Sequence, residues 1–166
     1  MPARLLRPGG AVASVKFHTL RREQQIPRPI EEVFHFFSDA RNLEEITPPW
    51  LGFRTLTPGP IQLAVGARIR YRLRLHGAPV SWTTEIRRWD PPRRFIDVQL
   101  SGPYRLWHHT HRFEACDGGT RLSDLVRYRL LFGPLGRLVN ALVCGAMWNV
   151  FSSTEIAASE RYLARV

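Results

Sequence analysis

Lysine, cysteine and long apolar runs are what this sequence has least of. Among its 166 residues Lys16 is the only lysine, and Cys116 and Cys144 are the only cysteines. Two cysteines cannot make a disulfide-rich scaffold, and their positions match no metal or redox motif, which favours a reduced intracellular pair. No apolar run reaches membrane-spanning length, because even the segment 138–151 is interrupted by two asparagines and a glycine.

The start of the chain also lacks the continuous apolar core of a secretory signal peptide. Residues 1–13 are small and basic and contain proline and glycine, so we expect a flexible N-terminal extension there. The remaining residues 14–166 have the length of one domain of ordinary size. We therefore expect a single soluble domain in the cytoplasm.

The composition is that of a globular protein with an unusual charge. Hydrophobic residues make up 44% and charged residues 23%, which excludes a disordered chain, a collagen and a coiled coil. The formal net charge is +10, carried almost entirely by arginines that are spread along the chain. A positive net charge without a cluster of basic residues is only a weak indication of nucleic-acid binding. We therefore expect no specific nucleic-acid partner.

The residue pattern predicts an α+β fold. A first strand at residues 15–26 is followed by a helix that starts at Pro29 and a short helix at 42–46. About six antiparallel strands follow, and a long helix at 135–162 closes the chain. A curved antiparallel sheet of about seven strands cannot bury its inner face alone, so we expect it to wrap around the C-terminal helix.

The first predicted hairpin alternates strictly between arginine and apolar residues. Every second residue over 68–74 is arginine, and the residues between them, Ile69, Tyr71 and Leu73, share the inner face. A two-residue loop at 77–78 would place Leu73 opposite Trp82.

A second hairpin carries polar groups on its inner face. Trp107, His109, His111 and Phe113 share one face of the strand 105–115 by the period of two. A loop at 118–119 would place Phe113 opposite Asp124, His111 opposite Val126 and His109 opposite Tyr128.

Five motifs in this order carry a family resemblance: residues 36–43, 46–51, 82–95, 95–104 and 107–113. With them the chain resembles the SRPBCC (START-like) ligand-binding superfamily, in its branch related to polyketide cyclases and dehydrases. The resemblance implies the helix-grip fold, with an apolar cavity between the sheet and the C-terminal helix. Members of this superfamily bind lipids, polyketides and other hydrophobic molecules, and some are cyclases or hydrolases.

The strand at residues 95–100 has two readings. Hydrophobicity turns Ile96, Val98 and Leu100 inward, whereas the resemblance turns Phe95, Asp97 and Gln99 inward, and we follow the resemblance. The predicted ligand-binding residues are then Tyr71, Leu73, Trp82, Thr84, Ile86, Phe95, Asp97, Gln99, Trp107, His109, His111, Asp124 and Tyr128.

The buried polar residues of this set have three interpretations. They form a structural hydrogen-bond network, or a polar patch that orients a ligand in an apolar pocket. In the third, His109 and His111 join a carboxylate around a metal ion. We expect no metal and no cofactor, because histidines on one strand face are common without a metal. If the protein is an enzyme, its catalytic candidates are His109, His111, Asp97 and Asp124.

Three functions remain in view from the sequence. The first is binding of a hydrophobic small molecule or lipid in an internal cavity. The second is a cyclase or dehydratase acting on a polyketide-type substrate through the His-Asp cluster; motifs of other enzyme classes are missing. The third is a non-catalytic interaction module, in which an outward row of Ile96, Val98 and Leu100 supports a homodimer.

Overall fold

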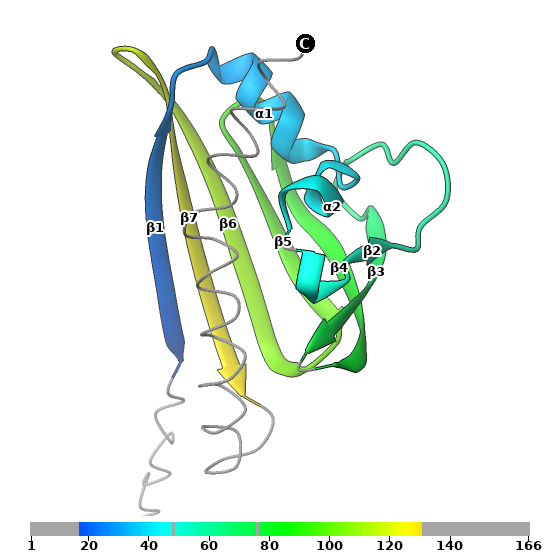
Figure 1. The fold of residues 1–166 in the computed structure, drawn as a ribbon. Coiled ribbons are helices and arrows are strands. Elements are labelled where there is room, and N and C mark those ends of the chain that lie inside the picture. Colours follow the sequence, from blue (N-terminus) through cyan, green and yellow to red (C-terminus); the bar gives the residue numbers. More distant parts are fainter. Residues whose placement is uncertain (1–16, 48, 76, 131–166) are drawn as a thin grey trace, which may run out of the picture.

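The computed structural model describes residues 17–47, 49–75 and 77–130. The elements in chain order are β1 (His18–Ile26), α1 (Ile30–Ser38), α2 (Asn42–Ile46), the 3-10 helix η1 (Pro49–Leu51), β2 (Arg54–Thr55), β3 (Arg68–Leu75), β4 (Ala78–Asp90), β5 (Arg94–Ser101), β6 (Tyr104–Cys116) and β7 (Gly119–Leu130) (Figure 1). The expected extension at 1–13, the expected helix at 135–162 and Cys144 lie outside these residues.

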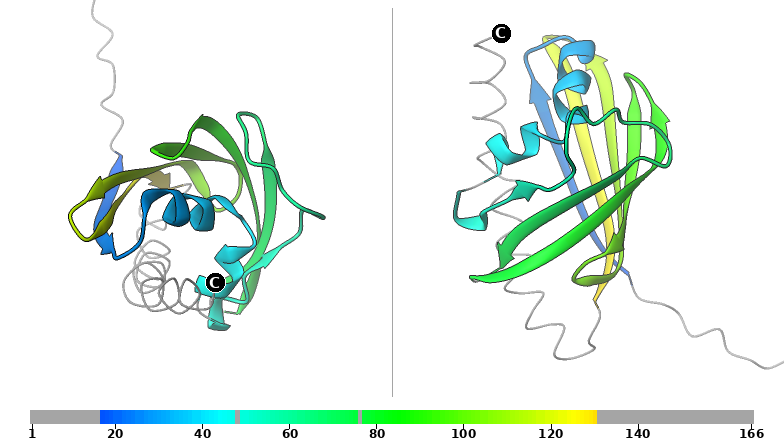
Figure 2. Two further views of the ribbon diagram at one scale, coloured as in Figure 1. Left: turned by 90° about the horizontal axis from the view of Figure 1, so that it is seen from above. Right: turned by 90° about the vertical axis from the view of Figure 1, so that its right-hand side faces the viewer.

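The strands of the described ranges form one antiparallel sheet in the order β1-β7-β6-β5-β4-β3-β2. The sheet is strongly curved, and α1 and α2 lie on its concave side (Figure 2). The predicted α+β class is confirmed, with its sheet of about seven strands and two short helices after the first strand. None of the helices within the described ranges is long and apolar enough to cross a bilayer.

Helix α1 begins where the sequence favours a helix start. Pro29 occupies the position before the first helical residue with a φ of −56°, and Glu31 and Glu32 lie in the first turn, where acids suit the helix dipole. The helix ends as the Asp39 amide donates to the Phe36 carbonyl. Its buried face consists of Val33, Phe34, Phe36 and Phe37.

This face of α1 packs on the sheet to form the main core. The Phe34 ring lies 5.2 Å from Phe113 on β6 and 6.0 Å from Phe95 on β5, in edge-to-face contacts. Ile26, Ile86 and Leu122 complete the same cluster and are almost fully buried. The core therefore anchors α1 over the middle strands.

The predicted register of the first hairpin is wrong by two residues. Leu75 pairs with Ala78, and Leu73 lies opposite Val80 rather than Trp82. The connection is thus one residue earlier than predicted, and Gly77, with a φ of 82°, takes its second position, which glycine accepts without strain. A shift of two residues leaves every side chain on its predicted face.

The second hairpin shows the same error. Cys116 pairs with Gly119, so the turn is Asp117-Gly118, a favoured pair in two-residue hairpins. His111 therefore lies opposite Asp124 instead of Val126. His109 lies opposite Val126 instead of Tyr128, and Phe113 opposite Leu122 instead of Asp124.

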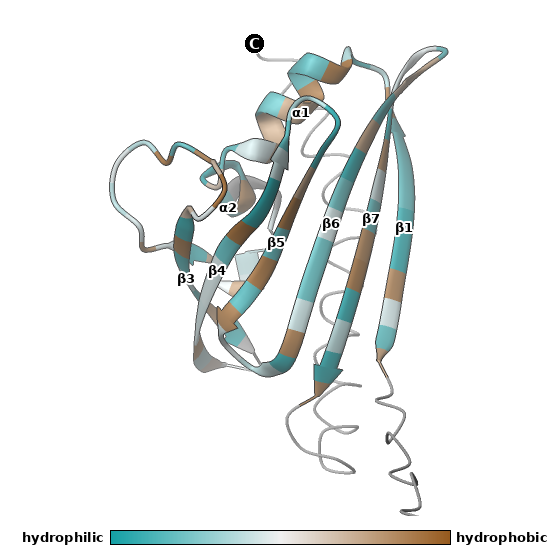
Figure 3. Ribbon diagram, turned by 180° about the vertical axis from the view of Figure 1, so that it is seen from behind, coloured by the Kyte–Doolittle hydropathy of each residue, from teal (hydrophilic) through white to brown (hydrophobic). Residues whose placement is uncertain are grey.

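The orientation of strand β5 in the sheet is the one that the resemblance implied. Phe95 is buried and Asp97 faces the concave side, whereas Ile96, Val98 and Leu100 face outward. Figure 3 shows this outer face, where β5 carries hydrophobic residues beside a mostly hydrophilic β6. The outward row exists, and the homodimer built on it stays a prediction.

Gly119, the first residue of β7, packs tightly against the backbone at the end of β1. Its φ is 142°, and a Cβ there would overlap the Ile26 carbonyl oxygen and approach Pro27 Cα to 2.8 Å. We expect Gly119→Ala to lower the free energy of unfolding by about 2–4 kcal/mol, through backbone strain and displacement of β1. Gly77→Ala, with nothing within 4 Å of its Cβ, should cost only about 1 kcal/mol. Urea unfolding of both variants measures the difference, and equal losses would contradict this account.

Candidate functional site

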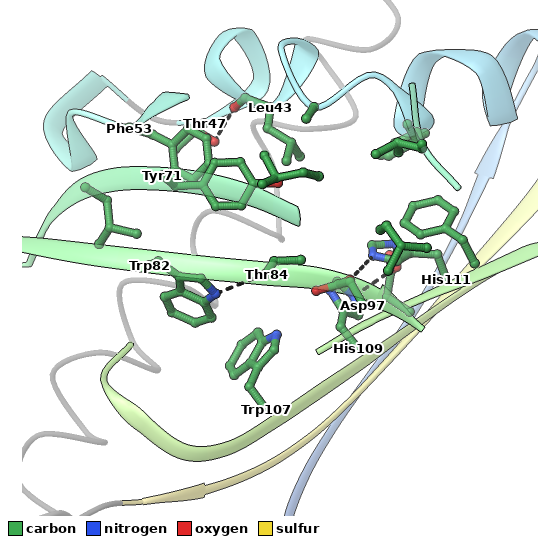
Figure 4. Close-up of a pocket in the computed structure, with 18 of the residues that line it drawn as sticks. Leu43, Thr47, Phe53, Tyr71, Trp82, Thr84, Asp97, Trp107, His109 and His111 are labelled. Carbon is green, nitrogen blue, oxygen red and sulfur yellow. Dashed lines mark hydrogen bonds and ion pairs between the residues drawn. The ribbon is translucent and has the colours of Figure 1, made fainter. Parts of the chain in front are cut away.

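A cavity of about 170 Å³ opens on the concave side of the sheet (Figure 4). Among the described residues its wall is mostly apolar, and its aspartate and histidine side chains lie together in one part of the wall. The lining residues are Phe37, Ala40, Leu43, Thr47, Leu51, Phe53, Leu63, Ile69, Tyr71, Leu73, Trp82, Thr84, Ile86, Phe95, Asp97, Trp107, His109, His111 and Asp124.

All but two of the predicted ligand-binding residues line this cavity, and the exceptions are Gln99 and Tyr128. The Gln99 side chain donates to the Tyr104 carbonyl at 2.6 Å and accepts from the Tyr104 amide at 3.4 Å, which closes the β5–β6 turn. Tyr128 stacks on His18 of β1 with ring centroids 5.1 Å apart. Each therefore holds strands together instead of lining the cavity.

Sequence reasoning missed the wall opposite the sheet. Phe37 comes from α1, and the rest come from the segment that follows: Ala40, Leu43, Thr47, Leu51, Phe53 and Leu63. The apolar face of α1 could have indicated Phe37. The others lie in short or irregular elements without a hydrophobic period, so no local signal gives their direction.

At the polar part of the wall, two histidines lie between two aspartates. His111 Nε2 is 3.1 Å from Asp97 Oδ2, and His111 Nδ1 is 2.8 Å from Asp124 Oδ1. His109 repeats the pattern more loosely, with Nδ1 3.7 Å from Asp97 Oδ2 and Nε2 3.3 Å from Asp124 Oδ1. All four side chains are at most 13% exposed.

Strand pairing alone brings these residues together. His109 and His111 are two residues apart on β6, so both face the cavity. On one side β5 places Asp97 opposite His109, and on the other β7 places Asp124 opposite His111. Each aspartate is then a direct neighbour of one histidine and a diagonal neighbour of the other.

The two carboxylates decide the charge of His111. Burial by itself lowers the pKa of His111, but the hydrogen bonds to Asp124 and Asp97 outweigh burial and raise the pKa from 6.5 to about 9. Burial likewise favours the neutral form of Asp124, yet contacts with His109 and His111 lower its pKa far below the ordinary range. At neutral pH His111 is therefore an imidazolium clamped by carboxylates.

Aromatic and hydroxyl groups border the cluster on the apolar side. Trp82 Nε1 donates to Thr84 Oγ1 at 3.2 Å, and the Trp82 and Trp107 rings meet edge to face at 5.2 Å. Burial, reinforced by the negative charge of Asp97, raises the pKa of the Tyr71 hydroxyl, which therefore stays protonated. The cavity thus offers hydroxyl donors and acceptors beside the charged cluster.

The same cluster has the residue types of a metal site. One ligand atom each from Asp97, His109 and His111 lies within 4.8 Å of the others. Two imidazoles and a carboxylate suit zinc or iron. The arrangement can therefore hold a cation, orient a polar ligand group or transfer a proton.

The curved sheet with a cavity on its concave face is the helix-grip fold. Residues 26–151 match the family model described as "Polyketide cyclase / dehydrase and lipid transport". The chain belongs to this family, as its sequence motifs suggested. Among curated proteins, none matches the sequence.

Solved structures from several bacteria share the fold. TTHA0849 from Thermus thermophilus is 25% identical with a TM-score of 0.66, over 89% of this chain and 99% of that one. The Zhui aromatase/cyclase from Streptomyces sp. R1128 is 16% identical with a TM-score of 0.68, over 89% and 96%. Ms6760 from Mycobacterium smegmatis is 20% identical with a TM-score of 0.65, over 89% and 91%.

The raised pKa of His111 makes stability depend on pH. The folded state holds the proton more tightly than the unfolded state, so this stabilisation is complete below pH 6.5 and is lost as pH rises through about 9. We expect the free energy of unfolding to fall by on the order of 1–3 kcal/mol across this window.

His111→Gln should remove this pH dependence and also destabilise the protein at pH 6, because the buried aspartates lose their charged partner. His108→Gln is the matched control, since His108 lies on the opposite face of β6 and outside the cavity lining. Urea unfolding in a chelating buffer at a series of pH values measures all three proteins. Parallel curves for wild type and His111→Gln would refute the assignment.

Proposed function

We propose that this protein binds a hydrophobic small molecule that carries one polar group, in the cavity between the sheet and the segment after α1. The observation that carries the proposal is the division of the cavity wall. Most of its residues are apolar or aromatic, while the side chains of Asp97, His109, His111 and Asp124 lie together in one part of the wall. Such a wall favours burial of the apolar part of a ligand. Its polar groups fix the orientation of the ligand by binding one hydroxyl or carbonyl group that the ligand carries.

The size and the relatives agree with an aromatic or lipid-like ligand. A cavity of about 150 Å³ holds a benzene molecule, so the 170 Å³ here admits at least one ring. The family description names polyketide cyclases, dehydrases and lipid transport. One structural neighbour, the Zhui protein, is described as an aromatase/cyclase. These are properties of the relatives, and they guide the choice of probes.

The direct test is binding of a naphthalene-based fluorescent probe or a fluorescent fatty acid. We expect a Kd in the micromolar range, about −8 kcal/mol, since an apolar ligand gains mainly from burial. Leu73→Trp, which fills the cavity from β3, should weaken binding at least tenfold. Leu100→Trp is the matched control, because Leu100 is 42% exposed on the outer face, and it should leave the affinity unchanged. Equal effects of the two substitutions would contradict binding in this cavity.

A cyclase or dehydratase is the second candidate, and the position of His111 supports it. An imidazolium held at the cavity wall by two aspartates has a proton to donate, and Tyr71 and Thr84 lie in the same wall. Each ring nitrogen of His111 faces an aspartate, so a substrate carbonyl would have to replace one carboxylate as the acceptor before His111 acts as the general acid.

We expect carrier behaviour without turnover when aryl ketone, polyketide-like and ester compounds are incubated with the protein and followed by mass spectrometry. In that case His109→Gln and His111→Gln change ligand affinity by about 1 kcal/mol and no product forms with any variant. Product formed by the wild type and lost in either variant, while probe binding and folding persist, would make the protein an enzyme. His108→Gln controls for nonspecific effects of removing a histidine.

A further inference from the structure

We propose that Asp97, His109 and His111 form a binding site for one divalent first-row transition-metal ion at the wall of the cavity. The ligand atoms are Asp97 Oδ2, His109 Nδ1 and His111 Nε2. This site does not depend on the identity of the hydrophobic ligand.

The spacing of the three atoms suits a metal ion. Asp97 Oδ2 lies 3.1 Å from His111 Nε2 and 3.7 Å from His109 Nδ1, and the three residues each offer an atom within 4.8 Å of the others. Bonds of about 2.0–2.2 Å to nitrogen and oxygen separate neighbouring ligand atoms by roughly 3–3.5 Å. The side chains therefore need only small rotations to close around an ion.

Asp124 supplies what a histidine-metal site needs behind its ligands. A ligating histidine usually donates its second ring N–H to a carboxylate, which fixes the ring and its tautomer. Asp124 Oδ1 faces the remaining nitrogen of both rings, at 3.3 Å from His109 Nε2 and 2.8 Å from His111 Nδ1. One carboxylate thus lies beside the second nitrogen of both imidazoles, while Asp97 lies on the side of the proposed ion.

Charge also favours a cation at this place. Asp97 and Asp124 are two largely buried carboxylates, and the described part of the cavity wall contains no lysine or arginine. A divalent ion that takes the place of the His111 proton leaves both imidazoles neutral and offsets the charge of the two carboxylates. Three protein ligands leave a coordination position open toward the cavity, where the polar group of a bound molecule can reach the ion.

The expectation of no metal came from the pair of histidines alone, because histidines on one strand face are common without a metal. The predicted register placed Asp124 opposite Phe113. In the structure His111 is opposite Asp124 and His109 is opposite Asp97. A pair of histidines on one strand face thereby becomes a set of three ligands with its supporting carboxylate.

The test uses the full chain, stripped with a chelator and titrated with Zn²⁺. We expect one equivalent by calorimetry and by elemental analysis after gel filtration. Asp97→Asn and His109→Gln should abolish stoichiometric uptake, and Asp124→Asn should weaken it about 10–100-fold. His108→Gln should bind as the wild type does. A folded wild type that retains no zinc, or uptake unchanged in Asp97→Asn and His109→Gln, would overturn the site.

A measurement on the wild type alone guards against variants that fail to fold. Zinc should shift the imidazole ¹⁵N resonances of two histidines in the NMR spectrum, those assigned to His109 and His111. Shifts confined to other histidines would refute the assignment. Binding of the apolar probe by the metal-free protein is measured in parallel, so a failed metal site is distinguished from a failed cavity.

Discussion

The arrangement of this site depends on one constraint, the burial of two carboxylates at the middle of a sheet. Asp97 on β5 and Asp124 on β7 lie on either side of β6, and each must meet a donor that is itself nearly buried. His111 contacts both, at 3.1 Å and 2.8 Å. An unpaired charge in such a place costs several kcal/mol, so a one-residue slip of either strand would be strongly unfavourable. The cluster therefore specifies the register of three strands.

Hydrophobic burial on these strands does not come from this cluster. The aromatic core under α1, built on Phe34, Phe95 and Phe113, supplies hydrophobic burial on the same strands. A buried ion-pair network is often less stabilising than apolar residues of equal volume. Since apolar side chains could close the sheet at least as well, the polar groups are better explained by what they do at the cavity wall. That is the physical ground for placing function there.

The sequence predicted the faces of the strands far better than their alignment. Alternation put Tyr71, Trp107 and His109 on the inner face, and the structure agrees. Both predicted hairpin registers were wrong by two residues. Moving a two-residue loop by one position along the chain shifts the strand pairing by two residues, and every side chain then stays on the same face of the sheet. The facing of β5 could not come from hydrophobicity at all, since Ile96, Val98 and Leu100 lie on the outer face. The family resemblance settled that point where the physical pattern pointed the other way.

The two walls of the cavity differ in how firmly they are built. On the sheet side, Phe95 stacks on His111 at 4.1 Å and Trp107 meets His109 at 6.3 Å, so aromatic rings hold the polar groups from both directions. Apart from Phe37 of α1, the described part of the opposite wall comes from α2, a helix of five residues, and from the short or irregular chain that follows it. So short a helix has little stability of its own and depends on its packing. For the binding function proposed above, the polar wall would set which functional group is recognised, and the wall around α2 would set how large a molecule can enter.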